Sequence, residues 1–444
     1  MGTTNSMAKN KQSQLKSIPY DTIAVIGLGY VGLPLLLELA KKFKTIGFDI
    51  DKEKIKELQN NYDKTNECTE QDLKSTSALI TNNSSDITNA PIKIVTVPTP
   101  VDSTNNPDLT ILKNASELIA NHIKKNDIII YESTVYPGVT EDICAPIIES
   151  ISGLKLNEDF FLAYSPERLS PGDTNRTLTK VVKVVSGSTP EVCDICANIY
   201  SKIISAGVHK TSSIKIAEAS KVIENTQRDL NIAFMNELSI IFNKMNINTT
   251  EVIEAASTKW NFMKMTPGLV GGHCIGVDPY YLINKSKELG HLPNLILAAR
   301  RINDGMGNYI AKEMIKLLVK AKLDIPNARI GIFGLTFKEN VSDIRNSKVI
   351  DIIQELTDFQ CTPLIHDPYA IPNDVKKEYN LTLTPLESML DLDAIIIAVP
   401  HKPYQKMALE EFSKRIKHPT KVIYDIKSLL KDSTITPDII YKSL

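Results

Sequence analysis

The N-terminal part of the chain contains the sequence TIAVIGLGYVG at residues 22–32. Its first five residues predict a buried strand, and the pattern of residues 33–42 predicts a helix directly after the glycines. Gly27 permits the tight turn, Gly29 lets a pyrophosphate approach the backbone, and Gly32 lets the helix pack on the strand. This order predicts a dinucleotide-binding, Rossmann-like domain, with an ordinary glycine turn of an α/β protein as the alternative.

An acidic residue after the second predicted strand narrows the choice of dinucleotide. Residues 45–49 form that strand and end in Asp49, at the distance from the glycines where a carboxylate binds the adenosine ribose. Because a carboxylate repels a 2′-phosphate, Asp49 favours NAD over NADP. Lys54 is a candidate contact on the adenosine side, and a solvated helix lysine is the simpler interpretation of that residue taken alone.

The composition fits a protein of several domains without a strongly charged partner. The 444 residues suffice for two or three domains, and a net charge of -1 without basic runs gives no reason to expect nucleic acid or an anionic membrane as a partner. No apolar run is long enough to span a bilayer. Residues 1–19 are polar and lack the apolar core of a signal peptide, so we expect a disordered tail and a cytoplasmic protein.

The six cysteines are scattered and form no disulfide framework. Cys193 and Cys196 make a C-x-x-C pair within a predicted helix, without the further ligands that a zinc site needs, so we expect no metal. Cys274 differs, because it lies among glycines and prolines with Asp278 four residues on. A thiol there is either a structural cysteine or a nucleophile, and the glycines that admit a substrate favour the nucleophile.

Strands and helices alternate through the N-terminal half, which predicts a parallel sheet with ligand sites at the carboxyl ends of its strands. Thr134 follows the strand predicted at residues 127–131 and would lie near the nicotinamide. Glu167 and Arg168 follow the strand predicted at residues 160–164. A turn residue and a solvated loop are the respective alternatives.

A single long helix is predicted from Ile214 to Met245, since no proline or glycine interrupts the pattern. Glu218, Lys221, Asn225 and Arg228 recur at three- to four-residue spacing and share one face. The apolar residues later in the helix predict burial between domains or subunits. A buried lysine and asparagine need polar partners, which a binding site supplies.

A second α/β pattern follows a proline-containing connection near residues 324–328. Its strands and helix are predicted at residues 329–335, 347–359, 362–367 and 394–399. The pattern lacks the full glycine fingerprint, so we expect it to bind a single nucleotide rather than a dinucleotide. Lys338 and Arg345 are candidates to hold phosphates there.

Six motifs follow one another along the chain. They are Gly27-x-Gly29-Tyr30-Val31-Gly32, Glu132-Ser133-Thr134-Val135-Tyr136-Pro137-Gly138, Ser165-Pro166-Glu167-Arg168, Glu218-Ala219-Ser220-Lys221-x-x-x-Asn225, Gly271-Gly272-His273-Cys274-x-x-x-Asp278 and Phe337-Lys338 to Asp343-x-Arg345. In this order they resemble the UDP-glucose/GDP-mannose dehydrogenase family, over nearly everything after residue 20. The resemblance implies an NAD-dependent enzyme that oxidises the C6 alcohol of a nucleotide sugar to a carboxylate in two hydride transfers.

The resemblance also implies catalytic roles. Cys274 would hold the sugar covalently, first as a thiohemiacetal and then as a thioester that water hydrolyses. Lys221 would stabilise the developing alkoxide and oxyanion, and Asn225 would donate a hydrogen bond at the same centre. Asp278 would orient Lys221 or a water molecule.

The remaining implied roles concern water, cofactor and substrate. Glu167 and Thr134 match positions that handle water and protons during hydrolysis. The implied NAD-binding residues are Gly27, Gly29, Tyr30, Val31, Gly32, Asp49, Lys54, Thr99, Thr134 and Arg345. The implied substrate-binding residues are Glu167, Arg168, Lys221, Asn225, Gly271, Gly272, Arg301 and Lys338. Because Arg301 resembles an arginine that reaches a neighbouring subunit's substrate, we expect a homodimer or larger homo-oligomer built on the long helix.

The patterns together predict an α/β protein with two Rossmann-like, doubly wound parallel-sheet domains joined by a long central helix. The predicted parts are a tail at residues 1–19, an NAD-binding domain at 20–213, a central region with the catalytic lysine and cysteine at 214–324, and a UDP-sugar-binding domain at 325–444.

The substrate is predicted from the residues around the cysteine. Residues 272–281 and 165–169 resemble the branch that oxidises UDP-N-acetylhexosamines, and His273 departs from the UDP-glucose branch. We expect UDP-N-acetylglucosamine or UDP-N-acetylgalactosamine, oxidised for a surface polysaccharide such as a capsule or O-antigen. The alternatives are UDP-N-acetylmannosamine, UDP-glucose and GDP-mannose. A non-catalytic nucleotide-sugar-binding protein is a further alternative, against which the combination of Cys274 with Lys221 argues.

Overall fold

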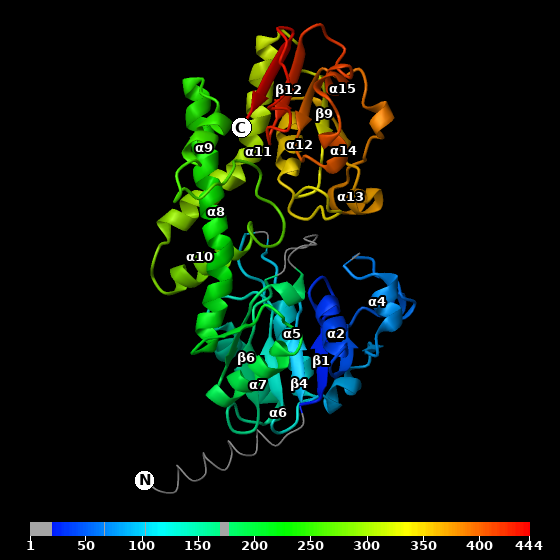
Figure 1. Ribbon diagram of the computed structural model, residues 1–444, viewed down its shortest axis with the longest axis vertical. Coiled ribbons are helices and arrows are strands. Elements are labelled where there is room, and N and C mark those ends of the chain that lie inside the picture. The colour runs from blue at the N-terminus through cyan, green and yellow to red at the C-terminus, as the bar shows by residue number, and fades with distance from the viewer. Residues whose placement is uncertain (1–19, 66, 103, 169–176) are drawn as a thin grey trace. The chain divides into compact units, whose positions relative to one another are not determined.

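The computed structural model describes residues 20–65, 67–102, 104–168 and 177–444, and Figure 1 shows its helices and strands. The chain forms two compact units: unit 1 is Met1–Glu224 with Tyr280–Glu288, and unit 2 is Asn225–Pro279 with Leu289–Leu444. The tail predicted at residues 1–19 lies outside the described residues. The four predicted domain boundaries remain predictions.

Unit 1 is built on a sheet whose described strands run in the order β3-β2-β1-β4-β5-β6-β7-β8. Neighbouring strands are parallel except β6 and β7, which pair antiparallel. The strands are β1 (Thr22–Ile26), β2 (Lys44–Phe48), β3 (Leu79–Thr81), β4 (Ile92–Val95), β5 (Ile128–Tyr131), β6 (Phe161–Tyr164), β7 (Lys183–Gly187) and β8 (Val208–Lys210). The order of the strands reverses between β1 and β4: the chain builds the sheet outward in one direction from β1 to β3 and in the other direction from β4 onward. Such a switch point places a binding crevice beyond the carboxyl ends of these two strands.

The helices between these strands are α2 (Gly32–Ala40), α3 (Lys52–Gln59), α4 (Glu70–Ser75), α5 (Thr110–Ala120), α6 (Ala145–Ser152) and α7 (Pro190–Ser201) (Figure 1). Helices α2, α3 and α7 contact strands of the sheet, and α5 and α6 contact each other. The core forms because the apolar strand residues meet apolar helix faces; Ile23 and Val25 of β1 are fully buried with Leu35 and Leu36 of α2.

The long helix α8 runs from Ile214 to Met245, as predicted, and Figure 1 shows it as one continuous ribbon. Its residues belong to unit 1 as far as Glu224 and to unit 2 from Asn225 onward. The helix ends where Asn246 adopts a φ of 56°, the left-handed conformation that commonly stops a helix.

Unit 2 contains a second sheet, with its described strands all parallel in the order β10-β9-β11-β12-β13. The strands are β9 (Arg329–Phe333), β10 (Thr362–His366), β11 (Ala394–Ile397), β12 (Lys421–Asp425) and β13 (Ile439–Ser443). The helices that begin after α8 are α9 (Thr249–Ala256), α10 (Asp278–Glu288), α11 (Asn294–Lys320), α12 (Val349–Asp358), α13 (Pro372–Tyr379), α14 (Lys402–Gln405) and α15 (Leu409–Ser413). The two α/β sheets confirm the predicted fold class.

The turn after the first strand is built in the same way in both sheets. Gly27 and Gly334 follow these strands with φ of 96° and 99°. In unit 1 the next amide, of Leu28, donates to Asp49 Oδ2 at 2.9 Å, and in unit 2 the amide of Leu335 donates to Asp367 Oδ2 at 2.6 Å. Each aspartate follows the second strand of its sheet, so each closes the turn of the neighbouring strand.

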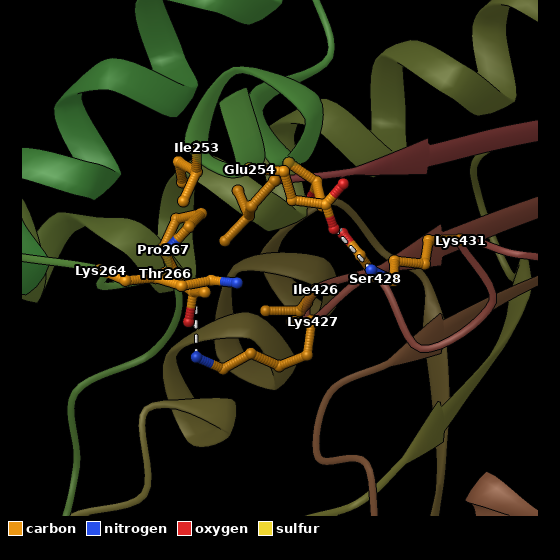
Figure 2. A pocket seen from close by; sticks show the side chains of 11 residues that line it. Ile253, Glu254, Lys264, Thr266, Pro267, Ile426, Lys427, Ser428 and Lys431 are labelled. Atoms are coloured by element: carbon orange, nitrogen blue, oxygen red, sulfur yellow. Dashed lines mark hydrogen bonds and ion pairs between the residues drawn. The ribbon is translucent and has the colours of Figure 1, made fainter. Parts of the chain in front are cut away.

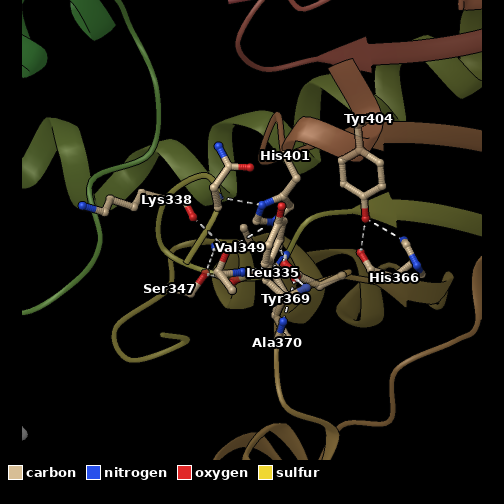
Figure 3. A network of polar contacts seen from close by, with 12 residues as sticks. Leu335, Lys338, Ser347, Val349, His366, Tyr369, Ala370, His401 and Tyr404 are labelled. Atoms are coloured by element: carbon tan, nitrogen blue, oxygen red, sulfur yellow. Dashed lines mark hydrogen bonds and ion pairs between the residues drawn. The ribbon is translucent and has the colours of Figure 1, made fainter. Parts of the chain in front are cut away.

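The Asp367 carboxylate is shielded from solvent by the groups around it. His401 Nε2 lies 2.9 Å from Asp367 Oδ2, and both side chains are fully buried. Figure 3 shows this network around His401, together with Leu335 and Tyr369. His401 Nδ1 accepts the Asn340 amide at 2.9 Å. Burial opposes ionisation of Asp367, but the hydrogen bond and charge of His401, together with the amides of Leu335 and Thr336, outweigh it and lower the pKa of the carboxyl to about 2.

Within the described residues, the helices include none with the length and apolarity required to traverse a bilayer.

A buried ion pair joins β4 to the residue that precedes β5 in unit 1. Lys93 of β4 is fully buried, and its Nζ donates to Asp127 Oδ2 and to the Ala90 carbonyl, both at 2.6 Å. Burial lowers the pKa of the Lys93 ammonium and raises that of the Asp127 carboxyl, so each group depends on the charge of the other.

We predict that Lys93→Met destabilises unit 1, because it leaves Asp127 buried without its cation. The expected loss is about 3–5 kcal/mol, seen as a fall of roughly 10 °C in the thermal midpoint followed by circular dichroism. Lys125→Met is the matched control, since Lys125 pairs with Asp159 but its side chain is 72% exposed. The control should lose no more than about 1 kcal/mol, and equal losses in the two variants would contradict the prediction.

Candidate active site

The glycine turn of unit 1 is shaped to receive a dinucleotide. A Cβ on Gly32 would lie 1.9 Å from the Gly27 carbonyl oxygen, so the start of α2 packs directly on the turn. A Cβ on Gly29 would meet no atom within 4 Å, so the backbone there borders open space. Helix α2 has no side-chain cap at Val31, which leaves amide donors for an anion. Tyr30 and Val31 lie within this turn, and the residues present therefore fit the pyrophosphate of NAD.

Asp49 and Lys54 lie together at the ribose end of this turn. Lys54 Nζ contacts Asp49 Oδ2 at 2.8 Å, and the Asp51 amide donates to Asp49 Oδ1 at 3.0 Å. The Lys54 side chain is half-buried, so it is more than the solvated helix lysine of the simpler interpretation. The pair presents both an acceptor and a cation on the side where adenosine is expected.

Thr99 and Thr134 meet at the carboxyl end of the sheet. Thr99 Oγ1 donates to the Thr134 carbonyl at 2.6 Å, and the Tyr281 hydroxyl donates to the Thr99 carbonyl at 2.5 Å. Thr99 follows β4 and Thr134 follows β5, so the two loops that border the crevice are tied together. This is where the nicotinamide of NAD is expected.

Glu218 anchors the start of α8 to the loop after Thr134. The fully buried carboxylate accepts the Gly138 amide at 2.5 Å and the Thr140 amide at 2.9 Å. Lys221 lies one helical turn further along α8 and is also buried. The motif that joins Glu218 to Lys221 in sequence therefore fixes the lysine relative to the strand-end loops of unit 1.

Glu167 and Arg168 follow β6, as predicted. Glu167 Oε1 accepts the Arg168 amide at 2.6 Å, and its Oε2 contacts Lys183 Nζ at 2.9 Å. The Arg168 guanidinium pairs with Glu224 at 2.7 Å and donates to the Val182 carbonyl at 3.0 Å. Arg168 is therefore held in place by α8 and by the segment that precedes β7.

Unit 2 brings Asn225, Asp278 and the Cys274 loop together. Cys274 is exposed, and its carbonyl accepts the Val277 amide at 3.1 Å and the Asp278 amide at 2.8 Å. Asn225 Nδ2 donates to Asp278 Oδ2 at 2.5 Å, and both of these side chains are buried. Asn225 lies one turn after Lys221 on α8, so one helix carries two of the predicted catalytic residues. The exposure of Cys274 does not fit a buried structural cysteine, and its role as a nucleophile remains a prediction.

The glycines before the cysteine pack against the loop after β9. A Cβ on Gly272 would lie 2.8 Å from the ring of Phe337, and one on Gly271 would lie 2.6 Å from the Asn346 carbonyl oxygen. Asn346 Nδ2 also donates to the Gly272 carbonyl at 3.3 Å. Lys338 follows Phe337 directly, with its ammonium 5.7 Å from that ring. The structure therefore brings the predicted substrate-side residues Gly271, Gly272 and Lys338 together.

Arg345 lies in the same loop but is engaged within unit 2. It makes two hydrogen bonds to Asp343, at 3.0 and 2.8 Å, and His273 Nε2 lies 3.2 Å from the same carboxylate. Burial would raise the pKa of Asp343, but hydrogen bonds from His273 and Arg345 hold it well below its usual value. The residue before the cysteine is thus coupled to the loop after β9 through an ionised aspartate.

A cavity of about 170 Å³ with a mixed apolar and charged lining lies beside the start of the cysteine loop in unit 2 (Figure 2). Lys264, Lys427 and Lys431 line it, with Glu254 among them. Lys427 Nζ donates to the Pro267 carbonyl at 2.9 Å, and burial lowers the pKa of this ammonium. Lys431 already pairs with Glu254 at 2.6 Å, so Lys264 and Lys427 are the lysines that suit an anion, which would compensate the buried charge of Lys427.

The sequence analysis did not predict several residues of the site. The cavity lysines occur in two segments about 160 residues apart, without a common motif. Lys183, which binds Glu167, begins the apolar strand β7, and no polar pattern in that strand indicated its role. Tyr281 ends the stretch 272–281 that resembles the N-acetylhexosamine branch, but no contact was predicted for its hydroxyl. Arg301 is exposed on α11, and no contact within the described chain shows what it binds.

Three family models match this chain in succession. They describe the NAD-binding domain, the central domain and the UDP-binding domain of the UDP-glucose/GDP-mannose dehydrogenase family, and match residues 21–204, 215–305 and 331–432. The first match confirms the predicted cofactor.

Curated relatives cover almost the whole chain. Protein CapL of Staphylococcus aureus is 51% identical over 413 residues, which are 93% of this chain and 97% of CapL. The UDP-N-acetyl-D-glucosamine 6-dehydrogenase of Pseudomonas aeruginosa is 51% identical over 92% of this chain and 97% of its own. A solved structure of UDP-D-ManNAc dehydrogenase from Pyrococcus horikoshii has a TM-score of 0.86 at 30% identity, covering 95% of this chain and 98% of that one. The chain therefore belongs to the UDP-glucose/GDP-mannose dehydrogenase family, and NAD is its cofactor.

Proposed function

We propose that this enzyme oxidises the C6 alcohol of UDP-N-acetylglucosamine to the carboxylate and consumes two NAD⁺. The observation that carries the proposal is the exposed thiol of Cys274 in a loop tied to the Asn225–Asp278 hydrogen bond at 2.5 Å. A thiol nucleophile, an amide donor and a carboxylate on neighbouring elements suit a reaction that passes through a covalent sugar.

Each residue has a part in this reaction. NAD⁺, when bound, accepts a hydride from C6 in each oxidation. Lys221 stabilises the negative charge that develops on the C6 oxygen, and Asn225 donates a hydrogen bond to the same oxygen. The Cys274 sulfur adds to the C6 aldehyde, and the thiohemiacetal becomes a thioester when its hydride leaves.

Hydrolysis of the thioester completes the proposed reaction. Glu167 accepts a proton from the attacking water, whose oxygen bonds to C6 while the C–S bond breaks and the Cys274 thiolate leaves. Thr134 and Asp278 orient the water and the proton acceptor. Because a thiol nucleophile needs a reducing compartment, the mechanism supports the predicted cytoplasmic location.

The lysine-lined cavity supports a nucleotide diphosphate as the remote part of the substrate. Lys427 and Lys431 lie within the matched UDP-binding domain, and Lys264 precedes the cysteine loop. The diphosphate would accept hydrogen bonds from Lys427 and Lys264, and the chain from Pro267 to Cys274 would lead from the phosphates to the reacting carbon. Lys338 would complete this cation set from the loop after β9.

The N-acetylglucosamine assignment is supported by the degree of similarity. The Pseudomonas enzyme named for this sugar is 51% identical, whereas the N-acetylmannosamine enzyme of known structure is 30% identical. The name of CapL supports a role in capsule synthesis. UDP-N-acetylgalactosamine and UDP-N-acetylmannosamine differ from the proposed substrate by the configuration of one carbon and are the alternatives to test.

An exposed apolar stripe on α8 supports a homodimer. Ile216, Ile223, Phe234, Ile241 and Met245 are between 44% and 57% exposed. Their spacing returns each to one side of a helix with about 3.6 residues per turn. The predicted burial of this helix between subunits would cover the stripe. A dimer built on it would also give the exposed Arg301 a partner substrate to reach.

The proposed function predicts the stoichiometry of the reaction. With excess NAD⁺ and UDP-N-acetylglucosamine, we expect two NADH per sugar consumed, measured at the endpoint by absorbance. The two epimeric sugars, UDP-glucose and GDP-mannose serve as parallel substrates. One NADH per sugar would show that oxidation stops at the aldehyde, and reduction of NAD⁺ by an epimer alone would overturn the sugar assignment.

The second prediction concerns the nucleophile. Cys274→Ser should lower acid formation by at least about 10³-fold, because a hydroxyl is a far weaker nucleophile than a thiolate at neutral pH. NAD binding, measured by titration calorimetry, should be unchanged. Cys68→Ser is the control and should keep full activity, since Cys68 is half-buried in unit 1. Full turnover of Cys274→Ser would exclude the covalent mechanism.

The third prediction concerns assembly. The double variant Phe234→Glu/Ile241→Glu should shift the protein from dimer to monomer in light scattering coupled to size exclusion, because two carboxylates cannot be buried in an apolar interface. Ile151→Glu adds one such carboxylate on α6, where Ile151 is 44% exposed, and should leave the mass unchanged. A dimer that survives the double variant would place the interface elsewhere.

A further inference from the structure

A buried cluster of one lysine, two carboxylates and a phenol lies behind Glu167 in unit 1. Lys183 Nζ on β7 contacts Glu132 Oε2 and Glu167 Oε2, each at 2.9 Å. The Tyr200 hydroxyl on α7 donates a short hydrogen bond to Glu132 Oε1. Lys183, Glu132 and Tyr200 are at most 3% exposed, and Glu167 is 9% exposed. Glu167 is thus the member of the cluster nearest to solvent.

The charges in this cluster depend on one another. Burial raises the pKa of Glu132, since a carboxylate without water is costly. Burial alone would lower the pKa of Lys183, but the two carboxylates raise it above its usual value. Lys183 therefore remains a cation, and its ammonium stands between two carboxylates that would otherwise repel each other. Removal of that charge would favour the protonated form of at least one of them.

Packing alone does not account for the cluster. A buried ion pair adds little stability compared with apolar residues of the same volume, so the core of unit 1 gains little from it. Lys183, by contrast, forms an ion pair with Glu167, which follows β6 at the carboxyl edge of the sheet. Oε1 of that carboxylate accepts the Arg168 amide at 2.6 Å, so both Glu167 oxygens are oriented.

We propose that Lys183 is a positioning residue for Glu167: its ammonium keeps Glu167 ionised and oriented as the base of the water step. Glu132 and Tyr200 hold Lys183 in place from the interior. The inference rests on the proposed function, in which Glu167 accepts the proton of the attacking water. A base that must take up a proton has to be ionised in the resting enzyme, and in a buried position only a cation secures that.

The groups around Glu167 come from several elements. Lys183 approaches from β7, Glu132 from the end of β5, and Tyr200 from α7 through Glu132. Arg168, in its own segment, donates its backbone amide, and the Arg168 guanidinium pairs with Glu224 of α8. Of these, Lys183 places its ammonium in direct contact with the Glu167 carboxylate, at 2.9 Å.

The test compares two variants across a pH series. Lys183→Gln keeps N–H donors but loses the charge, and Lys183→Arg keeps the charge but changes the shape. For Lys183→Gln we expect the acid limb of kcat with UDP-N-acetylglucosamine to move up by about one pH unit or more, because the Glu167 pKa rises. Activity should recover toward the wild-type value at higher pH, and KM for NAD⁺ should not change. Lys183→Arg should keep the acid limb within about half a unit.

The controls separate this inference from a structural role and from failure of the proposed function. Lys210→Gln removes an exposed lysine from β8, 53% exposed, and should leave the pH profile unchanged. A fall in kcat of equal size at every pH in Lys183→Gln would overturn the inference, since a packing defect has no pH limb. If wild-type enzyme forms no NADH with any nucleotide sugar, the proposed function itself fails.

Wild-type enzyme provides a second measurement that needs no variant to fold. If Lys183 keeps Glu167 ionised, the acid limb of the wild-type kcat lies at or below the usual pKa range of a glutamate, about pH 4 to 5. An acid limb above about pH 6 would show that Glu167 is not held as a carboxylate and would overturn the inference.

Discussion

The aspartate at the end of the second strand is the constraint on which both sheets depend. Its carboxylate accepts the amide that follows a left-handed glycine, so the chain leaving the first strand can turn in only one way. In unit 1 this turn places the glycines beside the N-terminus of α2, where we predict that the pyrophosphate of NAD binds. In unit 2 it delivers the loop that carries Lys338 and packs on the glycines before Cys274. An equivalent amide-to-aspartate hydrogen bond thus positions the first loop of the sheet in each unit.

The two aspartates differ in what surrounds them, and this difference separates a dinucleotide site from a closed turn. Asp49 is accompanied by Lys54, whose side chain is 35% exposed, so the pair borders solvent. Asp367 is accompanied by His401 with no exposure on either side. A ribose can exchange hydrogen bonds with the first carboxylate, whereas the second is saturated by backbone amides and an imidazole. Unit 2 therefore keeps the architecture of a dinucleotide fold without its ribose acceptor.

The sequence predicted the parts of this protein that depend on local patterns. The strand before Gly27, the acid at Asp49 and the uninterrupted helix α8 follow from apolar periodicity and glycine spacing, and the structure confirms all three. The contacts of Lys183 could not be predicted, because its partners are 51 and 16 positions away, in the segments that follow β5 and β6. The same holds for β12 and β13, whose short apolar runs lack a distinctive flank. Catalytic roles are still predictions, since the bound substrate decides them.

The discontinuity of unit 1 has a consequence for synthesis of the chain. Residues 280–288 complete this unit, and Tyr281 bonds a carbonyl 182 positions earlier. A chain emerging from the ribosome cannot finish unit 1 until it has already produced the cysteine loop of unit 2. The cofactor half of the enzyme is therefore not an independent module that a single cut or a simple truncation can release. Tyr281, which makes this late contact, and Cys274, the proposed nucleophile, are synthesised within a few residues of each other, so unit 1 is completed only after unit 2 has begun to form.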